Sequence, residues 1–131
     1  MKFLAIIYSD ESLWTNATPE QVEASFAGHG ALTEEGAKAG VVLGGEGLQP
    51  VATATTLRVR DGERMLTDGP YAETKEQLGG YYLFDCKDLD EALDWAARIP
   101  EAEIGAVEVR PVMDYEAVQA AAAARAEGAA S

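Results

Sequence analysis

Residues 2–8 are apolar at nearly every position, and this segment constrains the fold more than any other part of the chain. The side chains of a β-strand alternate between the two faces of a sheet, so this strand presents bulky apolar groups on both faces. The segment is far too short to cross a membrane, which takes about 20 residues. We therefore expect a strand in a globular domain, with both of its faces needing a cover.

Local signals predict the other elements. Thr18, Pro19 and Gln21 are typical of a helix start, and Gly40 is typical of a helix end. One stripe of this helix carries Val22, Phe26, His29 and Leu32. The apolar side of a later helix, at 88–99, carries Leu89, Leu93, Ala96 and Ile99. The predicted order is a strand at 2–8, a polar loop at 9–17, a helix at 18–39, a strand at 41–45, a hairpin at 53–60 and 63–67, a strand at 78–86, a helix at 88–99, a strand at 104–112 and a helical tail from 114.

This order is a split βαβ plan with an added β-hairpin, and it predicts an α+β fold of the ferredoxin-like sandwich type. Both long helices then cover one face of the sheet. The other face carries bulky apolar groups, and apart from the tail the chain has no element left to cover it. We therefore predict a homodimer that packs open sheet face on open sheet face. Residues 1–113 form the domain, and 114–131 form an Ala-rich helix with a frayed end.

Charge and composition exclude several classes of function. The chain has 23 acidic and 10 basic residues and a net charge of −13, which is unfavourable for binding nucleic acids or anionic membranes. With one histidine and one cysteine, the chain has no set of zinc ligands. It also has no nucleotide-binding loop, so we expect neither metal nor cofactor. The N-terminus does not resemble a secretory signal, and we expect a cytoplasmic protein.

One run of sixteen residues is specific enough to indicate a family. Residues 67–82 read TDGPYAETKEQLGGYY, and residues 54–58, 88–93 and 107–112 agree with the same pattern. The run resembles the signature of the DGPF group of YCII-related proteins, and the likeness covers roughly residues 1–113. Tyr71 stands where the group has phenylalanine, so the aromatic ring is kept and a hydroxyl is added.

This resemblance implies a dimeric α+β barrel of ferredoxin-like subunits. It also implies an enzyme with a suspected His–Asp catalytic pair and lyase or isomerase chemistry on small organic molecules. Genes of the DGPF group often lie beside those of extracytoplasmic-function sigma factors. A regulatory or stress context, with a sigma factor as a partner, is implied by that association alone.

His29 and Asp68 are the candidates for the catalytic pair. Histidine is the natural proton carrier near neutral pH, and a carboxylate bonded to one ring nitrogen fixes the tautomer and raises the basicity of the other. Each residue also has a structural reading. His29 lies on an apolar stripe and would be a hydrogen-bonded core residue, whereas Asp68 would accept N–H bonds within its own turn. The sequence does not show whether the two residues meet.

Four further residues are candidate substrate contacts. Arg58 would hold an anionic group, although pairing with the surplus of carboxylates is the simpler explanation. Gly80 would allow close approach of a ligand, or instead tight packing between strands. Tyr71 and one of the strand tyrosines Tyr8, Tyr81 and Tyr82 would offer a hydroxyl to a pocket, or these rings pack as core aromatics. Cys86 has no basic neighbour that would activate a thiolate, so it is not a candidate nucleophile.

Two classes of function follow from these candidates. In the first, His29 moves a proton on a small organic substrate and Asp68 orients the imidazole, without a cofactor. In the second, the protein is a non-catalytic small-molecule-binding or regulatory dimer. A His29 ring that solvent reaches within a cleft favours the enzyme, and a fully enclosed ring favours the second class.

Overall fold

The computed structural model describes residues 1–130 and is mixed α+β with antiparallel sheets, which confirms the predicted class. Residue 131, at the end of the predicted tail, lies outside the described part. The elements follow in the order β1 (Lys2–Ser9), α1 (Glu11–Thr15), α2 (Pro19–Lys38), β2 (Val42–Gly47), a 3₁₀ turn η1 (Val51–Thr53), β3 (Thr55–Arg60), β4 (Glu63–Asp68), β5 (Gln77–Asp85), α3 (Leu89–Ala96), a 3₁₀ turn η2 (Pro100–Glu103), β6 (Ala106–Pro111) and α4 (Tyr115–Ala130).

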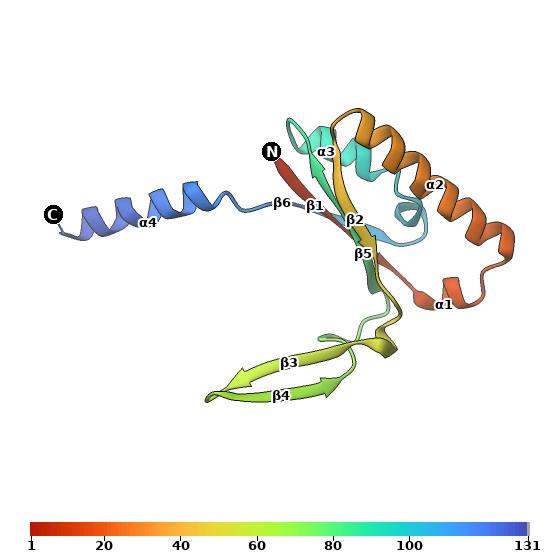
Figure 1. Ribbon diagram of the computed structural model, residues 1–131, viewed down its shortest axis with the longest axis horizontal. Helices are drawn as coiled ribbons and strands as arrows, with labels where there is room; N and C mark the ends of the chain where they lie inside the picture. Colours follow the sequence, from red (N-terminus) through yellow and green to blue (C-terminus); the bar gives the residue numbers. More distant parts are fainter. Residues whose placement is uncertain (131) are drawn as a thin grey trace.

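The main sheet has four strands in the order β2-β5-β1-β6, and every neighbouring pair is antiparallel. Helices α2 and α3 lie together on one face of this sheet (Figure 1). The core fills the space between the helices and the sheet, where burial of apolar side chains stabilises the layers. Its largest fully buried side chains are Phe3 from β1, Phe84 from β5, Leu32 from α2 and Ile99 after α3.

Strands β3 and β4 form a separate hairpin that projects away from the main sheet (Figure 1). Its turn is Asp61-Gly62, as predicted, with φ angles of 52° and 78°. Positive φ at both central residues gives the turn a twist that matches the flanking strands, and it favours Gly at the second position. Apolar side chains on the hairpin, Leu57 and Leu66 among them, are exposed within one chain.

The second face of the main sheet is uncovered within the chain. The side chains of Leu4, Ile6 and Tyr8 in β1 are only partly buried there, and Tyr81 in β5 is exposed. Helix α4 extends away from the sheet and leaves this face open (Figure 1). We call this surface the open sheet face. Within residues 1–130, no helix has the length and apolar character that crossing a membrane requires.

Helix α3 differs from its prediction in length and in part of the side that it buries. It ends at Ala96, and its buried side chains are Ala92 and Ala96. Of the four residues that the sequence predicts on its apolar side, Ala96 and Ile99 are buried, whereas Leu89 and Leu93 are exposed. Alanine leaves a helix free to approach a sheet closely, so these small residues face the core and the leucines do not.

Candidate functional site

His29 is held on the side of α2 that faces the sheet. Thr18 caps the start of this helix in a reciprocal capping box with Gln21, as predicted. Further along, Gly28 brings the turn η2 close to the helix, because a Cβ at position 28 would lie 2.8 Å from Cγ of Pro100. This close packing places Glu101, the residue after Pro100, beside the His29 ring.

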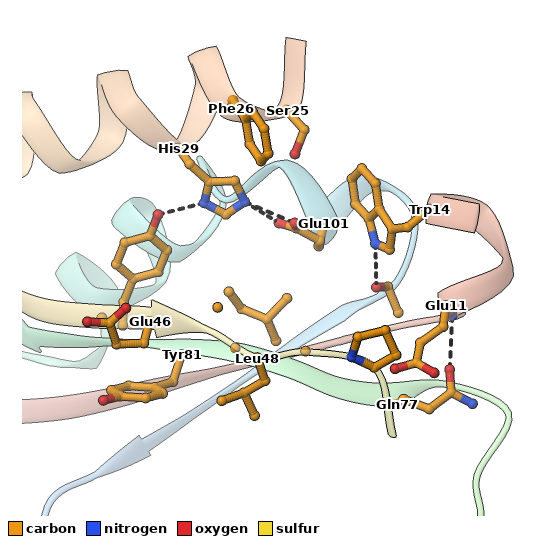
Figure 2. A pocket seen from close by; sticks show the side chains of 18 of the residues that line it. Glu11, Trp14, Ser25, Phe26, His29, Glu46, Leu48, Gln77, Tyr81 and Glu101 are labelled. Carbon is orange, nitrogen blue, oxygen red and sulfur yellow. Dashed lines mark hydrogen bonds and ion pairs between the residues drawn. The ribbon is translucent and has the colours of Figure 1, made fainter. Parts of the chain in front are cut away.

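The two nitrogens of His29 have different side-chain partners (Figure 2). Nδ1 lies 2.6 Å from the hydroxyl of Tyr82, and Nε2 lies 2.8 Å and 2.9 Å from the two carboxylate oxygens of Glu101. The side chains of His29 and Glu101 are 25% and 12% exposed. The imidazole also stacks on the Tyr82 ring, with centroids 5.8 Å apart. The ring is therefore fixed in position but not fully enclosed.

The Glu101 carboxylate, which can only accept, sets the direction of these hydrogen bonds. In the neutral imidazole, Nε2 carries the ring proton and donates it to Glu101, so Nδ1 accepts from the Tyr82 hydroxyl. Burial raises the pKa of the Tyr82 phenol above its ordinary value of 10.0, while a hydrogen bond with Thr33 lowers it and the charge of Glu101 raises it further. Thr33 lies one helical turn after His29, so α2 supplies two of the groups in this chain of hydrogen bonds.

The imidazole lies at the wall of a pocket of about 750 Å³ between α2 and the sheet. This volume is in the range of small-molecule sites, about 300–1,000 Å³. Part of the pocket wall on the sheet consists of backbone only, because β2 and β5 contribute glycines there, at Gly45, Gly47 and Gly80. The other lining residues are Ile7, Ser9, Glu11, Trp14, Thr15, Ser25, Phe26, Thr33, Glu46, Leu48, Pro50, Gln77, Gly79, Tyr81, Tyr82 and Glu101.

Helix α1 closes one end of the pocket, where the sequence predicted only a polar loop. Asp10 caps it by accepting a hydrogen bond from the Ser12 amide. Hydrogen bonds with the Ser12 side chain and with this amide lower the pKa of the Asp10 carboxyl. Gln77 accepts the Glu11 amide at 2.9 Å, and the Trp14 indole donates to Ser9. The bond between Glu11 and Gln77 joins distant parts of the chain. Together with the local bonds of Asp10 and Trp14, it holds a helix too short to be recognised from its sequence.

Asp68 does not meet His29 within the chain. It is the last residue of β4, on the projecting hairpin, and it does not line the pocket. Its carboxylate makes no hydrogen bond or ion pair among the described residues. Within the chain, Glu101 occupies the place beside the imidazole for which Asp68 was the candidate.

Arg58 and Tyr71 also lie outside the His29 pocket. The Arg58 guanidinium lies over the Tyr71 ring, 5.5 Å from its centroid. This contact is a cation–π pair, and it explains the arginine without a bound anion. Tyr71 is 81% exposed and borders a second hollow of about 480 Å³, together with Tyr8 and Pro70.

Gly80 and Tyr81 both border the His29 pocket, but in different ways. A Cβ at Gly80 would lie 2.8 Å from the Glu46 carbonyl oxygen, so packing between β2 and β5 is sufficient to require glycine there. Tyr81 and Tyr82 are neighbours in a strand and point to opposite faces of the sheet. The Tyr81 ring therefore lies on the open sheet face, and Tyr82 is the tyrosine that serves His29.

The remaining reactive groups do not form a second centre. Cys86 is buried, and burial, together with the nearby carboxylates Glu91 and Asp85, raises the pKa of its thiol to about 11. Among residues 1–130, no three histidine, cysteine, aspartate or glutamate side chains cluster as a metal site would require.

Sequence reasoning missed Glu101, and it considered Tyr82 only as one of three strand tyrosines that could offer a hydroxyl to a pocket. Tyr82 ends the signature run 67–82 but lies 53 positions from His29, whereas Glu101 has no local motif and lies 72 positions away. For Glu101 the usable signal was the pair Gly28-His29, since a glycine inside a helix often marks the close approach of another segment.

Two comparisons place the chain among known proteins. The model of the YCII-related domain matches residues 1–116. An uncharacterized protein from Rhizobium meliloti (strain 1021) is 40% identical over 118 residues, covering 88% of this chain and 95% of that protein. The sequence signature, the matched length and this relative agree, and the chain belongs to the YCII-related domain family.

Proposed function

We propose that the protein is a proton-transfer enzyme of the lyase or isomerase type that acts on a small organic molecule in the pocket below α2. The observation that carries the proposal is the linked set Tyr82–His29–Glu101 at the pocket wall. A carboxylate that accepts from one imidazole nitrogen and leaves the other as an acceptor is the arrangement that general base catalysis requires.

The proton path follows from the directions of the hydrogen bonds. The Tyr82 oxygen takes a proton from the substrate while its own proton passes to Nδ1 of His29. The resulting imidazolium is stabilised by Glu101 at 2.8 Å. Return of a proton by the same path to a different substrate atom completes an isomerisation, and loss of a leaving group before that return completes an elimination. Because the Tyr82 pKa is raised, the phenol acts as a relay and His29 must accept its proton in the same step.

The proposal includes membership of the DGPF group and a role for Asp68. Gly69 has φ +112°, which only glycine adopts readily, so the Asp-Gly-Pro signature corresponds to a backbone requirement at the end of β4. Asp68 carries no bond within the chain and lies on a projecting hairpin. A catalytic role for it requires the hairpin of a second subunit to reach the pocket.

We further propose the ferredoxin-like arrangement and a homodimer through the open sheet face. The strand order β2-β5-β1-β6 and the helices on one face support the first, and the uncovered apolar face supports the second. Ile6→Glu would place a charge in that interface and should yield monomers in light-scattering measurements. Leu89→Glu, on the exposed side of α3, is the matched control and should remain dimeric. Dimers of the Ile6→Glu variant would exclude this packing.

A deuterium-exchange assay tests the enzymatic activity. The protein is incubated in D₂O with a panel of small carbonyl and phenolic compounds, and NMR follows exchange of their C–H protons. We expect His29→Gln and Tyr82→Phe to lower an observed exchange rate by about 10²–10⁴-fold, the usual contribution of general acid–base catalysis. Tyr115→Phe, on α4, makes the same chemical change outside the pocket and should have no effect. Undiminished exchange in the His29→Gln variant would refute the mechanism.

One observation favours a second candidate, a non-catalytic small-molecule-binding or regulatory dimer. Both nitrogens of His29 already have partners, so the ring needs no ligand to be satisfied. For this candidate, panel compounds bind the pocket without any exchange in D₂O. A sigma-factor partner belongs to this reading and rests only on the gene association of the DGPF group. The cytoplasmic location is proposed from the sequence.

A further inference from the structure

The charge of the pocket lining is strongly one-sided. Glu11 and Glu101 contribute carboxylates to it, and among the described residues that line it there is neither lysine nor arginine. His29 is the one lining residue that can become cationic, and it already faces Glu101. The chain as a whole carries a net charge of −13, so its overall field has the same sign as the pocket.

The carboxylates of Glu11 and Glu101 are both held in place by hydrogen bonds. Glu11 accepts the backbone N–H of Val51 at 2.9 Å, and Glu101 accepts from His29. Figure 2 shows Glu11, Trp14 and Glu101 around the same hollow. A bound anion would therefore face fixed carboxylates with no cation to compensate them.

The uncharged part of the lining is aromatic and aliphatic. Phe26 is 73% exposed, although sequence reasoning placed it on the buried stripe of α2. It lies beside His29, while Trp14, Leu48 and Pro50 provide further apolar surface. An exposed aromatic ring at the wall of a pocket is suited to contact a flat apolar group.

We propose that the pocket selects an uncharged or cationic molecule with a flat apolar part and rejects carboxylates and phosphate esters. This inference rests on the proposed function, because it names the substrate class of the same site. It also replaces the expectation that Arg58 holds an anionic substrate group, since that arginine lies on the hairpin against Tyr71. Aromatic rings attract cations, so the predicted order of affinity is cation, then neutral molecule, then anion.

Binding of three matched probes tests the inference without any turnover. Benzylamine, benzyl alcohol and benzoate share one ring and differ in charge. The protein has two tryptophans, so the Trp95→Phe variant leaves Trp14, in the pocket, as the single fluorescent indole. We expect saturable changes in Trp14 fluorescence, with benzoate bound at least about tenfold more weakly than benzylamine.

Two charge variants test whether a carboxylate of the pocket lining causes the weak binding of benzoate. Glu11→Gln keeps an oxygen that accepts from Val51, removes one charge from the lining and should strengthen benzoate binding. Glu23→Gln, on α2 and outside the lining, removes the same charge and should not. The inference is overturned if benzoate binds as tightly as benzylamine, if Glu23→Gln acts like Glu11→Gln, or if none of the three probes produces a saturable change. If the predicted order holds and deuterium exchange is absent, the substrate class stands and the catalytic proposal fails.

Discussion

The contact between His29 and Glu101 predicts a coupling energy that a double-mutant cycle can measure. The two side chains are mostly buried, and Nε2 lies 2.8 Å from the carboxylate. A hydrogen bond to a charged group contributes about 1.5–3 kcal/mol, whereas an exposed ion pair contributes at most about 1 kcal/mol. For His29→Leu and Glu101→Leu we therefore expect a coupling of about 2 kcal/mol, which changes the unfolding equilibrium roughly thirtyfold.

The cycle separates this contact from the other bond of the imidazole. His29→Leu also removes the acceptor of the Tyr82 hydroxyl, but that loss occurs in the single and the double variant alike and cancels. Of the two partners in the His29–Glu101 contact, each single variant leaves one without its bond, and the double variant removes both. The double variant should therefore be more stable than the sum of the single losses predicts.

Urea unfolding at neutral pH and one fixed protein concentration, followed by tryptophan fluorescence, gives the four free energies of unfolding. The matched control is the cycle of Glu34→Ala and Lys38→Ala, an exposed pair on the same helix with side chains 71% and 75% exposed. Its coupling should be about 0.3–0.5 kcal/mol. If the His29–Glu101 coupling is no larger than that of the control, the geometry described for the site is wrong.

Three further predictions follow from the same packing. Gly28→Ala would place a Cβ 2.8 Å from Pro100 and should destabilise the fold by about 1–3 kcal/mol. Gly30→Ala meets no atom within 4 Å and should be neutral or stabilising. Equal urea unfolding midpoints for the two variants would contradict this prediction. Burial raises the Tyr82 pKa, so the protonated phenol's contribution to the stability of the fold is complete below its ordinary pKa and is lost as pH rises above about 10. Absorbance titration of the wild type should show a late-ionising tyrosine that Tyr82→Phe lacks. Cys86, with its thiol pKa raised to about 11, should react with dithiodipyridine far faster in urea than in the native state, and rapid native labelling would count against its burial.

The elements that the sequence predicted correctly have strong local causes. The hairpin turn depends on two adjacent residues that tolerate positive φ, and the start of α2 depends on a capping box within four residues. The alternation of strands and helices then follows from hydrophobic periodicity alone. Such features need no knowledge of distant parts of the chain.

The face that a helix buries depends instead on its neighbours. In α3 the predicted apolar side correctly contains Ala96, but Leu89 and Leu93 are exposed and Ala92 lies in the core, because close approach to the sheet leaves space for small side chains only. In α2 the stripe correctly contains Leu32, whereas Phe26 lies over the pocket and remains exposed. Periodicity shows that a stripe exists but not where a cavity interrupts it.

The acid beside His29 shows the same limit at the level of function. Asp68 stood out because it belongs to a rare motif, while Glu101 was one of 23 acidic residues without a motif. What selects Glu101 is the packing of Pro100 against Gly28, a contact between segments far apart in the chain. Because Glu101 already binds Nε2, a second acid from the same chain has no free nitrogen to accept from. Asp68 can therefore take part in the chemistry only as a group that faces the substrate, and only if assembly of two subunits carries the hairpin to a neighbouring pocket.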